Sequence, residues 1–291
     1  MWDVILDAIL DTLKIFPFLL IIYVLIELLE HKTSFAKNGK LLQGKLAPLL
    51  GSLTGLVPQC GFSVMSAKLY DRRLISTGTL LAVFLATSDE AFVILLSSGS
   101  SAGAVMPLLT VKFVVAVAFG YLANLVLKGE ELGSAESEHA DMHGYSCGRE
   151  HDGKHNLKVY LVEPLLHSLK IAFFVLVVNV ALGLVIHYVG TDAIANSLVG
   201  NEFLQPLITS LVGLIPNCAS SVVITETFIK GSITFGSMVA GLCANAGLGL
   251  VILYKNTKKI GRNLLFTLAL YAIASVVGIA VNYCQILFNL A

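Results

Sequence analysis

The sequence predicts an all-α integral membrane protein made of two inverted repeats, each with three spanning helices and one re-entrant helical hairpin. Three observations predict it: an apolar composition, a duplicated Pro-x-Cys motif and basic residues gathered in particular loops. Of 291 residues, 56% are hydrophobic and 13% are charged. A soluble domain carries about 25% charged residues, so we expect the lipid bilayer to surround this chain. The net charge is zero, and we therefore expect no nucleic-acid partner.

The Pro-x-Cys motif occurs once in each half of the chain. The segment from Gly55 to Ser63 reads GLVPQCGFS, and the segment from Gly213 to Ser221 reads GLIPNCASS. The two copies are 158 residues apart (213 − 55), and this offset holds without a gap as far as Leu95. Such a long correspondence indicates an internal duplication.

The first half, residues 1–128, contains long and short apolar segments. A first span is expected at 10–29, and further spans at 74–98 and 104–127. Between them lie two short apolar pieces, 46–57 and 61–69, with Pro58 between them. A helix over 46–57 would be only about 18 Å long, which is too short for a hydrocarbon core of about 30 Å. These two pieces therefore predict a pair of half-helices.

The second half, residues 159–291, repeats this order after a polar segment. Residues 129–158 are rich in Gly, Ser, Glu, Asp and His, which predicts a flexible linker between the halves. Spans are expected at 159–188, 233–254 and 263–290, and the second short–Pro–short element covers 204–229.

The basic residues decide how the Pro-x-Cys elements enter the membrane. If each element is a hairpin that enters and leaves on one side, the basic loops 31–45, 68–73, 128–158 and 255–262 all face the cytoplasm. Both termini and the acidic loop 190–203 then lie outside a plasma or inner membrane. Three spans per half invert the second half, so the two hairpin tips should meet near mid-membrane.

The hairpin tips carry the first candidate site. Pro58 and Pro216 should each end a half-helix and free carbonyl oxygens near Leu56, Val57, Leu214 and Ile215 that attract cations. Each cysteine falls at the start of the returning half-helix, where thiolate is stabilised and can bind soft metal ions. The predicted ligands are Cys60, Cys218, Gln59, Asn217, Ser63 and Ser221. The alternative is that both cysteines are small buried packing residues.

An acidic pair in the following span adds charge to this site. Asp89 and Glu90 fall in the middle of 74–98, and an acidic side chain at that depth normally faces a cavity or a partner. We expect Asp89 to face the site and to supply charge or carry a coupling proton. The alternative is a salt bridge from this pair to Lys112, which fits if Lys112 neutralises Glu90. In the second half, Asn245 corresponds to Thr87 and is a further candidate ligand.

The linker holds a separate candidate for metal capture, because imidazole and thiol groups recur there every four residues. These residues are His139, His143, Cys147, His151 and His155. The alternative is a solvated polar linker whose histidines have no ligand.

These motifs resemble the family of ten-segment heavy-metal exporters, whose members are also labelled arsenic efflux proteins or manganese transporters. The resemblance rests on Gly-Leu-[Val/Ile]-Pro-x-Cys in both halves, on the Leu80-Leu81-Ala82 step and on Ser88-Asp89-Glu90-Ala91. The family often has Asp-Gly where this chain has Asp89-Glu90. Counting each hairpin arm as one segment also gives ten here. The resemblance implies export of a metal ion or metalloid.

The sequence therefore predicts a secondary-active exporter of a Mn, Zn or arsenite class substrate, which needs no cofactor and could form a homo-oligomer. No nucleotide-binding Gly-x-x-x-x-Gly-Lys-Ser/Thr motif occurs, so ATP-driven transport would need a partner. One alternative is export of an organic anion held by the half-helix N-termini. An intramembrane enzyme with Cys60 as nucleophile is disfavoured, because no histidine falls in the middle of an expected span to act as its base.

Overall fold

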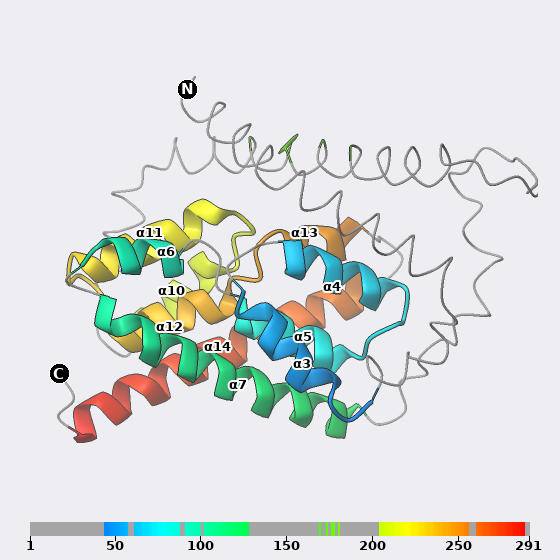
Figure 1. Cartoon of the computed structure of the whole chain (residues 1–291), viewed down its shortest axis with the longest axis horizontal. Coiled ribbons are helices and arrows are strands. Elements are labelled where there is room, and N and C mark those ends of the chain that lie inside the picture. The colour runs from blue at the N-terminus through cyan, green and yellow to red at the C-terminus, as the bar shows by residue number, and fades with distance from the viewer. Residues whose placement is uncertain are drawn as a thin grey trace, which may run out of the picture.

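The computed structural model describes residues 44–57, 61–87, 91–99, 102–127, 204–255 and 260–288, and the isolated positions 169, 173, 176, 177 and 180. The elements in these ranges are all helical, and no strand occurs among them (Figure 1). The all-α prediction is confirmed for this part of the chain.

The first half contributes short helices followed by one long helix. They are α3 (Ala47–Gly55), α4 (Gly61–Asp71), α5 (Thr77–Ala86), α6 (Ala91–Ser97), the 3₁₀ turn η1 (Ala102–Ala104) and α7 (Val105–Val126). Helices α3 and α4 have 9 and 11 residues, or about 14 and 17 Å at 1.5 Å per residue, so each is a half-helix as predicted.

The second half repeats this succession. Its helices are α10 (Gln205–Gly213), α11 (Cys218–Ile229), α12 (Phe235–Ala244), α13 (Leu248–Lys255) and α14 (Ile260–Phe288). Helices α10 and α12 begin 158 residues after α3 and α5 (205 − 47 and 235 − 77). The starts of α5 and α12 also have the same cap, since Ser76 accepts a hydrogen bond from the Thr79 N–H and Thr234 accepts one from the Ser237 N–H. The inverted insertion of the two halves remains a prediction.

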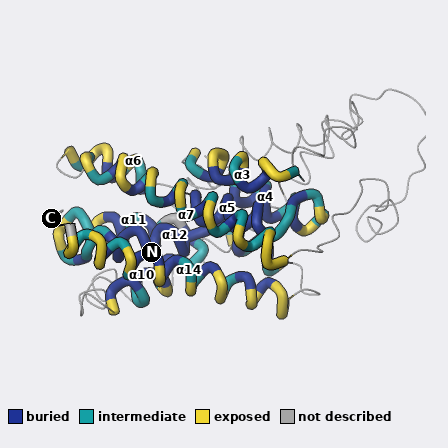
Figure 2. The backbone as a smooth tube through the Cα atoms, turned by 90° about the horizontal axis from the view of Figure 1, so that it is seen from below, coloured by how far each residue is buried: buried dark blue, intermediate teal, exposed yellow. Residues whose placement is uncertain are grey.

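Within the described ranges, four stretches are long and apolar enough to cross a membrane, and they form an inner and an outer pair. The inner pair, Thr77–Ser97 and Phe235–Lys255, is 73% and 94% buried, whereas the outer pair, Ala102–Val126 and Ile260–Leu287, is only 22% and 33% buried. The outer helices turn large apolar side chains outward, including Val126 and Leu265 (Figure 2). Such an apolar outer surface suits lipid chains.

The predicted spans at 74–98 and 233–254 match the inner stretches Thr77–Ser97 and Phe235–Lys255, but each stretch consists of two helices and not of one. Helix α12 ends at Ala244 and α13 starts only at Leu248. The Asn245 side chain accepts a hydrogen bond from the Gly247 N–H at 2.9 Å, and Gly247 has φ +54°, which glycine adopts without steric cost. Helix α5 ends at the corresponding position, with Thr87 as its C-cap (φ −53°, ψ 122°).

Glycines let the outer helices approach the inner ones in the same way in both halves. The Gly78 N–H donates to the Asn124 side chain at 3.1 Å, and a Cβ at Gly78 would overlap that oxygen and the Gly120 carbonyl. A Cβ at Gly236 would overlap the Asn282 side chain and the Gly278 carbonyl. These residues also differ by 158, so the duplication extends to residue 282 and includes α7 and α14.

Contacts between the halves are reciprocal. Helix α4 packs on α13, and its counterpart α11 packs on α6, the counterpart of α13. Figure 1 shows these two pairs at opposite ends of the molecule, while α5 and α12 meet between them. The interrupted inner helices therefore form the centre of the fold.

Candidate functional site

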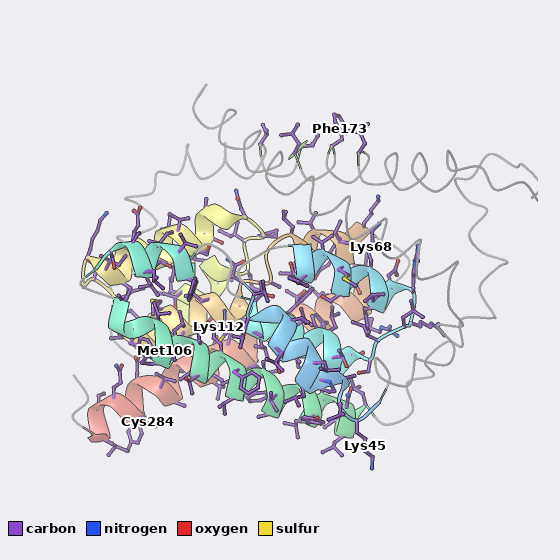
Figure 3. All side chains as sticks on the ribbon, in the orientation of Figure 1. Lys45, Lys68, Met106, Lys112, Phe173 and Cys284 are labelled. Atoms are coloured by element: carbon purple, nitrogen blue, oxygen red, sulfur yellow. The ribbon has the colours of Figure 1, made fainter. Side chains whose placement is uncertain are left out.

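Several helix ends meet in the central region of the described structure. They are the turn between α10 and α11, the interruption between α12 and α13, and the C-terminus of α5, with Lys112 of α7 reaching between α5 and α12 (Figure 3). Each of these ends lies at or near a residue that the sequence singled out.

The second Pro-x-Cys turn is held by its own polar groups. Helix α10 ends at Gly213, Pro216 lies in the turn, and Cys218 is the first residue of α11. Asn217 is the N-cap of α11, and its side chain accepts a hydrogen bond from the Ala219 N–H at 3.3 Å. Its amide oxygen is thus used within the turn and is available to a ligand only as a shared acceptor.

The Ile215 carbonyl oxygen was expected to be free for a cation, and this expectation is wrong. It accepts the Asn217 N–H at 2.7 Å and the Ser220 hydroxyl at 3.0 Å. A hydroxyl has one hydrogen, so Ser220 shares its hydrogen between this carbonyl oxygen and the nearer one of Asn217. Proline removes one N–H from the turn, but neighbouring residues satisfy the acceptor that it leaves.

Ser220 joins the two interruptions of the second half, and the sequence analysis missed it. Its hydroxyl also donates to the Asn217 carbonyl at 2.7 Å and accepts the Asn245 side-chain amide at 3.4 Å. The corresponding residue of the first half is Phe62, so comparing the repeats alone would not have found it. The turn before α11 and the interruption after α12 are therefore coupled.

Ser63 and Ser221, the predicted hydroxyl ligands, are both buried in helices that face the other half. The Ser63 carbonyl lies so close to α13 that a Cβ at Gly249 would come within 2.9 Å of it. The Ser221 carbonyl accepts the Thr225 hydroxyl at 2.7 Å. Ser63 thus lies at the interface between the halves, whereas the hydrogen bond of Ser221 lies within α11.

Lys112 is the only buried charged side chain in the part of the chain that the structure describes, and it has no exposed surface. Its Nζ donates to the Leu242 carbonyl at 2.7 Å and to the Thr87 carbonyl. The first lies in the last turn of α12, and the second caps α5. Helix C-termini carry partial negative charge, which stabilises an ammonium group.

Other predicted site residues lie outside the described residues, and their roles stay predictions. They are Pro58, Gln59, Cys60, Asp89, Glu90 and the linker residues His139, His143, Cys147, His151 and His155; of Cys218 only the backbone is described. The salt bridge from Lys112 to Glu90 stays a prediction for the same reason. The described residues alone contain no cluster of three or more His, Cys, Asp or Glu side chains that could hold a metal.

A cleft of about 340 Å³ lies beside the second Pro-x-Cys turn. It runs along α13 and α14 towards the end of α13, where Tyr254 and Thr267 share a hydrogen bond of 2.9 Å. Its lining residues are Leu214, Pro216, Leu250, Val251, Tyr254, Lys255 and Thr267. The apolar lining offers little to bind a metal ion.

A basic cluster lies where α4 meets the end of α13, at the edge of the candidate span Phe235–Lys255. Burial, together with the charges of Lys255 and Arg72, lowers the pKa of Lys68 from 10.5 to about 7, against an opposing effect of Asp71. The corresponding residue of the second half is Glu226, which is exposed. The corresponding positions near the ends of α4 and α11 therefore carry opposite charges.

Comparison with curated proteins and with solved structures finds no match. A family model matches the chain twice, over residues 2–166 and 160–288, and so covers almost all of it. The model's description is "Putative, 10TM heavy-metal exporter". The chain belongs to this family, ArsP_2.

Proposed function

We propose that the protein is a secondary-active transporter that exports a heavy-metal ion or metalloid of the Mn, Zn or arsenite class by alternating access. The observation that carries this proposal is the convergence of helix ends from both halves around Lys112. Substrate sites of secondary transporters commonly lie between discontinuous helices near the bilayer midplane. The family description supports the class of cargo.

The two halves would supply the moving parts. With inverted insertion, the α4–α13 and α11–α6 contacts face opposite sides of the membrane. Loosening one contact while the other stays closed would open the central site to one side only. Ser63 is buried where α4 meets α13, which supports a role for this contact in closing the site.

The metal ligands in this proposal are Cys60 and Cys218, with Asp89 supplying negative charge. Cys218 is the first residue of α11, and helix N-termini are where many metal-binding and reactive cysteines lie. Oxygen ligands would complete the shell and decide between a soft ion and a harder one such as Mn²⁺. The candidate oxygen ligands are Gln59, Asn217, Ser63, Ser221 and Asn245.

Metal tolerance of cells tests the thiol ligands. We expect the double variant Cys60→Ser/Cys218→Ser to lose the tolerance that the wild-type protein confers. Cys284→Ser is the matched control, because Cys284 is exposed near the end of α14, far from Lys112 (Figure 3). Equal tolerance with both variants, at equal amounts of membrane protein, would show that the thiols are not ligands.

A second candidate function is export of an organic anion, and the buried positive charge of Lys112 favours it. The capped N-terminus of α11 would hold a carboxylate in the same region. Competition experiments separate the two functions: Mn²⁺ or Zn²⁺ should compete with a metal substrate, and short carboxylates should compete with an organic anion.

A further inference from the structure

Lys112 occupies a position built from both halves of the chain. Its ammonium binds the carbonyl of Thr87 at the end of α5 and the carbonyl of Leu242 in the last turn of α12. Because α5 and α12 are corresponding helices, the two oxygens belong to corresponding regions of the two repeats. We call this pair of oxygens the carbonyl seat.

The carbonyl seat has the chemistry of a cation site. Each helix C-terminus is equivalent to roughly half a negative charge, so two of them together attract about one positive charge. Lysine has a compact ammonium group with three donors and no acceptor, which suits main-chain oxygens. The cation in the carbonyl seat is therefore the ammonium group of Lys112, a side chain of α7.

The scaffold does not require a lysine here. The corresponding residue of α14 is Leu270 (112 + 158), which is also fully buried and packs in the apolar core. The same helix arrangement is therefore built with leucine in one half and lysine in the other. A buried charge costs desolvation energy that leucine avoids, so its presence in one half only points to a function.

We propose that Lys112 is a tethered cation that fills the carbonyl seat in the substrate-free transporter, and that the exported substrate is a metal cation that displaces it. The inference rests on the proposed metal export and narrows its substrate to a cation. An ammonium group and a metal ion within the same carbonyl seat would repel each other strongly inside a protein, so the two exclude one another. After release, the ammonium returns and bridges α5 and α12, so the empty transporter needs no other cation there.

Binding of Mn²⁺ and Zn²⁺ to purified protein tests the displacement. If Lys112 blocks the metal site for most of the time, only the small unblocked fraction of the protein can bind the metal. Removing the Lys112 ammonium therefore raises the apparent affinity for the metal. We expect Lys112→Met to bind the metal about tenfold more tightly than wild type and to turn over more slowly. Leu270→Met, at the corresponding buried position of α14, is the matched control and should keep the wild-type affinity. Unchanged or weaker binding by Lys112→Met overturns the proposal.

A double variant separates displacement from simple charge compensation. If Lys112 only neutralises Glu90, then Lys112→Met/Glu90→Gln should recover wild-type affinity and turnover, and this result overturns the proposal. If Lys112 competes with the metal, the double variant keeps the slow turnover of Lys112→Met.

Chemical rescue tests the seat without relying on transport. In Lys112→Ala, added n-propylammonium replaces the missing part of the side chain, and we expect it to raise the apparent melting temperature, while neutral 1-propanol does not. The same ammonium should not affect the wild-type protein. Equal effects of the two additives, or none, overturn the proposal. This measurement uses no metal, so it still decides the question if metal export itself fails its test.

Discussion

The two halves of the molecule share a scaffold and differ in their polar residues. Glycine contacts, helix caps and interruptions recur at an offset of 158 residues. By contrast, Lys112 corresponds to Leu270, Lys68 corresponds to Glu226, and Phe62 corresponds to Ser220. Positions that pack helices are thus the same in both halves, while positions that carry charge or link the turns have diverged. The duplication accounts for the fold, and the differences locate the chemistry.

The largest expected effect tests the shared scaffold. Gly78→Val and Gly236→Val each place a side chain where the backbone carbonyl of the neighbouring outer helix already lies, at Gly120 or Gly278. A backbone oxygen cannot move aside cheaply, so we expect each variant to lose at least about 3 kcal/mol of stability. Fluorescence-detected size-exclusion chromatography should show loss of the monodisperse peak for both.

Gly261→Ala is the control for these variants, since a Cβ there meets no heavy atom within 4 Å. If only one of the two glycine variants is destabilised, the halves do not share their packing and the comparison fails.

A smaller loss of stability is expected when the residues that end α12 and α5, Asn245 and Thr87, are replaced. Asn245→Ala removes the hydrogen bonds to the Gly247 N–H and to Ser220, whereas Thr87→Val removes one hydroxyl bond to the Val83 carbonyl. We expect a loss of about 1–2 kcal/mol for Asn245→Ala and about 0.5–1 kcal/mol for Thr87→Val. Thermal unfolding in detergent measures both. A larger loss for Thr87→Val would contradict the view that the second interruption depends more on its side chain.

The last comparison concerns pH and the basic cluster. The folded state lowers the pKa of Lys68 from 10.5 to about 7, so the unfolded state binds more protons between these values. Stability should therefore rise as pH increases from about 7 towards 10.5, and the full penalty of the buried charge applies at pH 7 and below. Lys68→Gln should raise the melting temperature most near pH 6.5, with the gain shrinking towards pH 9.5.

Glu226→Gln, at the exposed counterpart position, should leave that slope unchanged. A gain from Lys68→Gln that stays constant across the pH range would mean that burial of the lysine charge is not the cause.

Much of the architecture could be predicted from the sequence because it depends on local patterns. Proline and short apolar length predicted α10 and α11 as half-helices, and the repeated motif identified their counterparts. The interruption at Asn245 was missed, because hydropathy is high on both sides and an Asn-Ala-Gly step is only a weak turn signal. Its cause is a side-chain hydrogen bond to Gly247, which periodicity does not reveal.

The site was predicted less completely, because it depends on contacts between distant segments. Lys112 was identified as a charge partner, but its Leu242 acceptor is 130 residues away and is a main-chain atom. Every residue has a main-chain carbonyl, so the sequence could not indicate that the carbonyl of Leu242 is the one that accepts this hydrogen bond. Ser220 was missed for a related reason, since its role arises from the meeting of two turns.

Transport into inside-out membrane vesicles tests the central claim most directly. Vesicles containing the wild-type protein should accumulate at least one of Mn²⁺, Zn²⁺, Cu⁺ or arsenite when energised with a proton gradient, and vesicles with Cys60→Ser/Cys218→Ser should not. Accumulation of a cation by wild type, and its loss in the double variant, is the result that the account predicts. Accumulation of none of these substrates above the level of vesicles lacking the protein would contradict it.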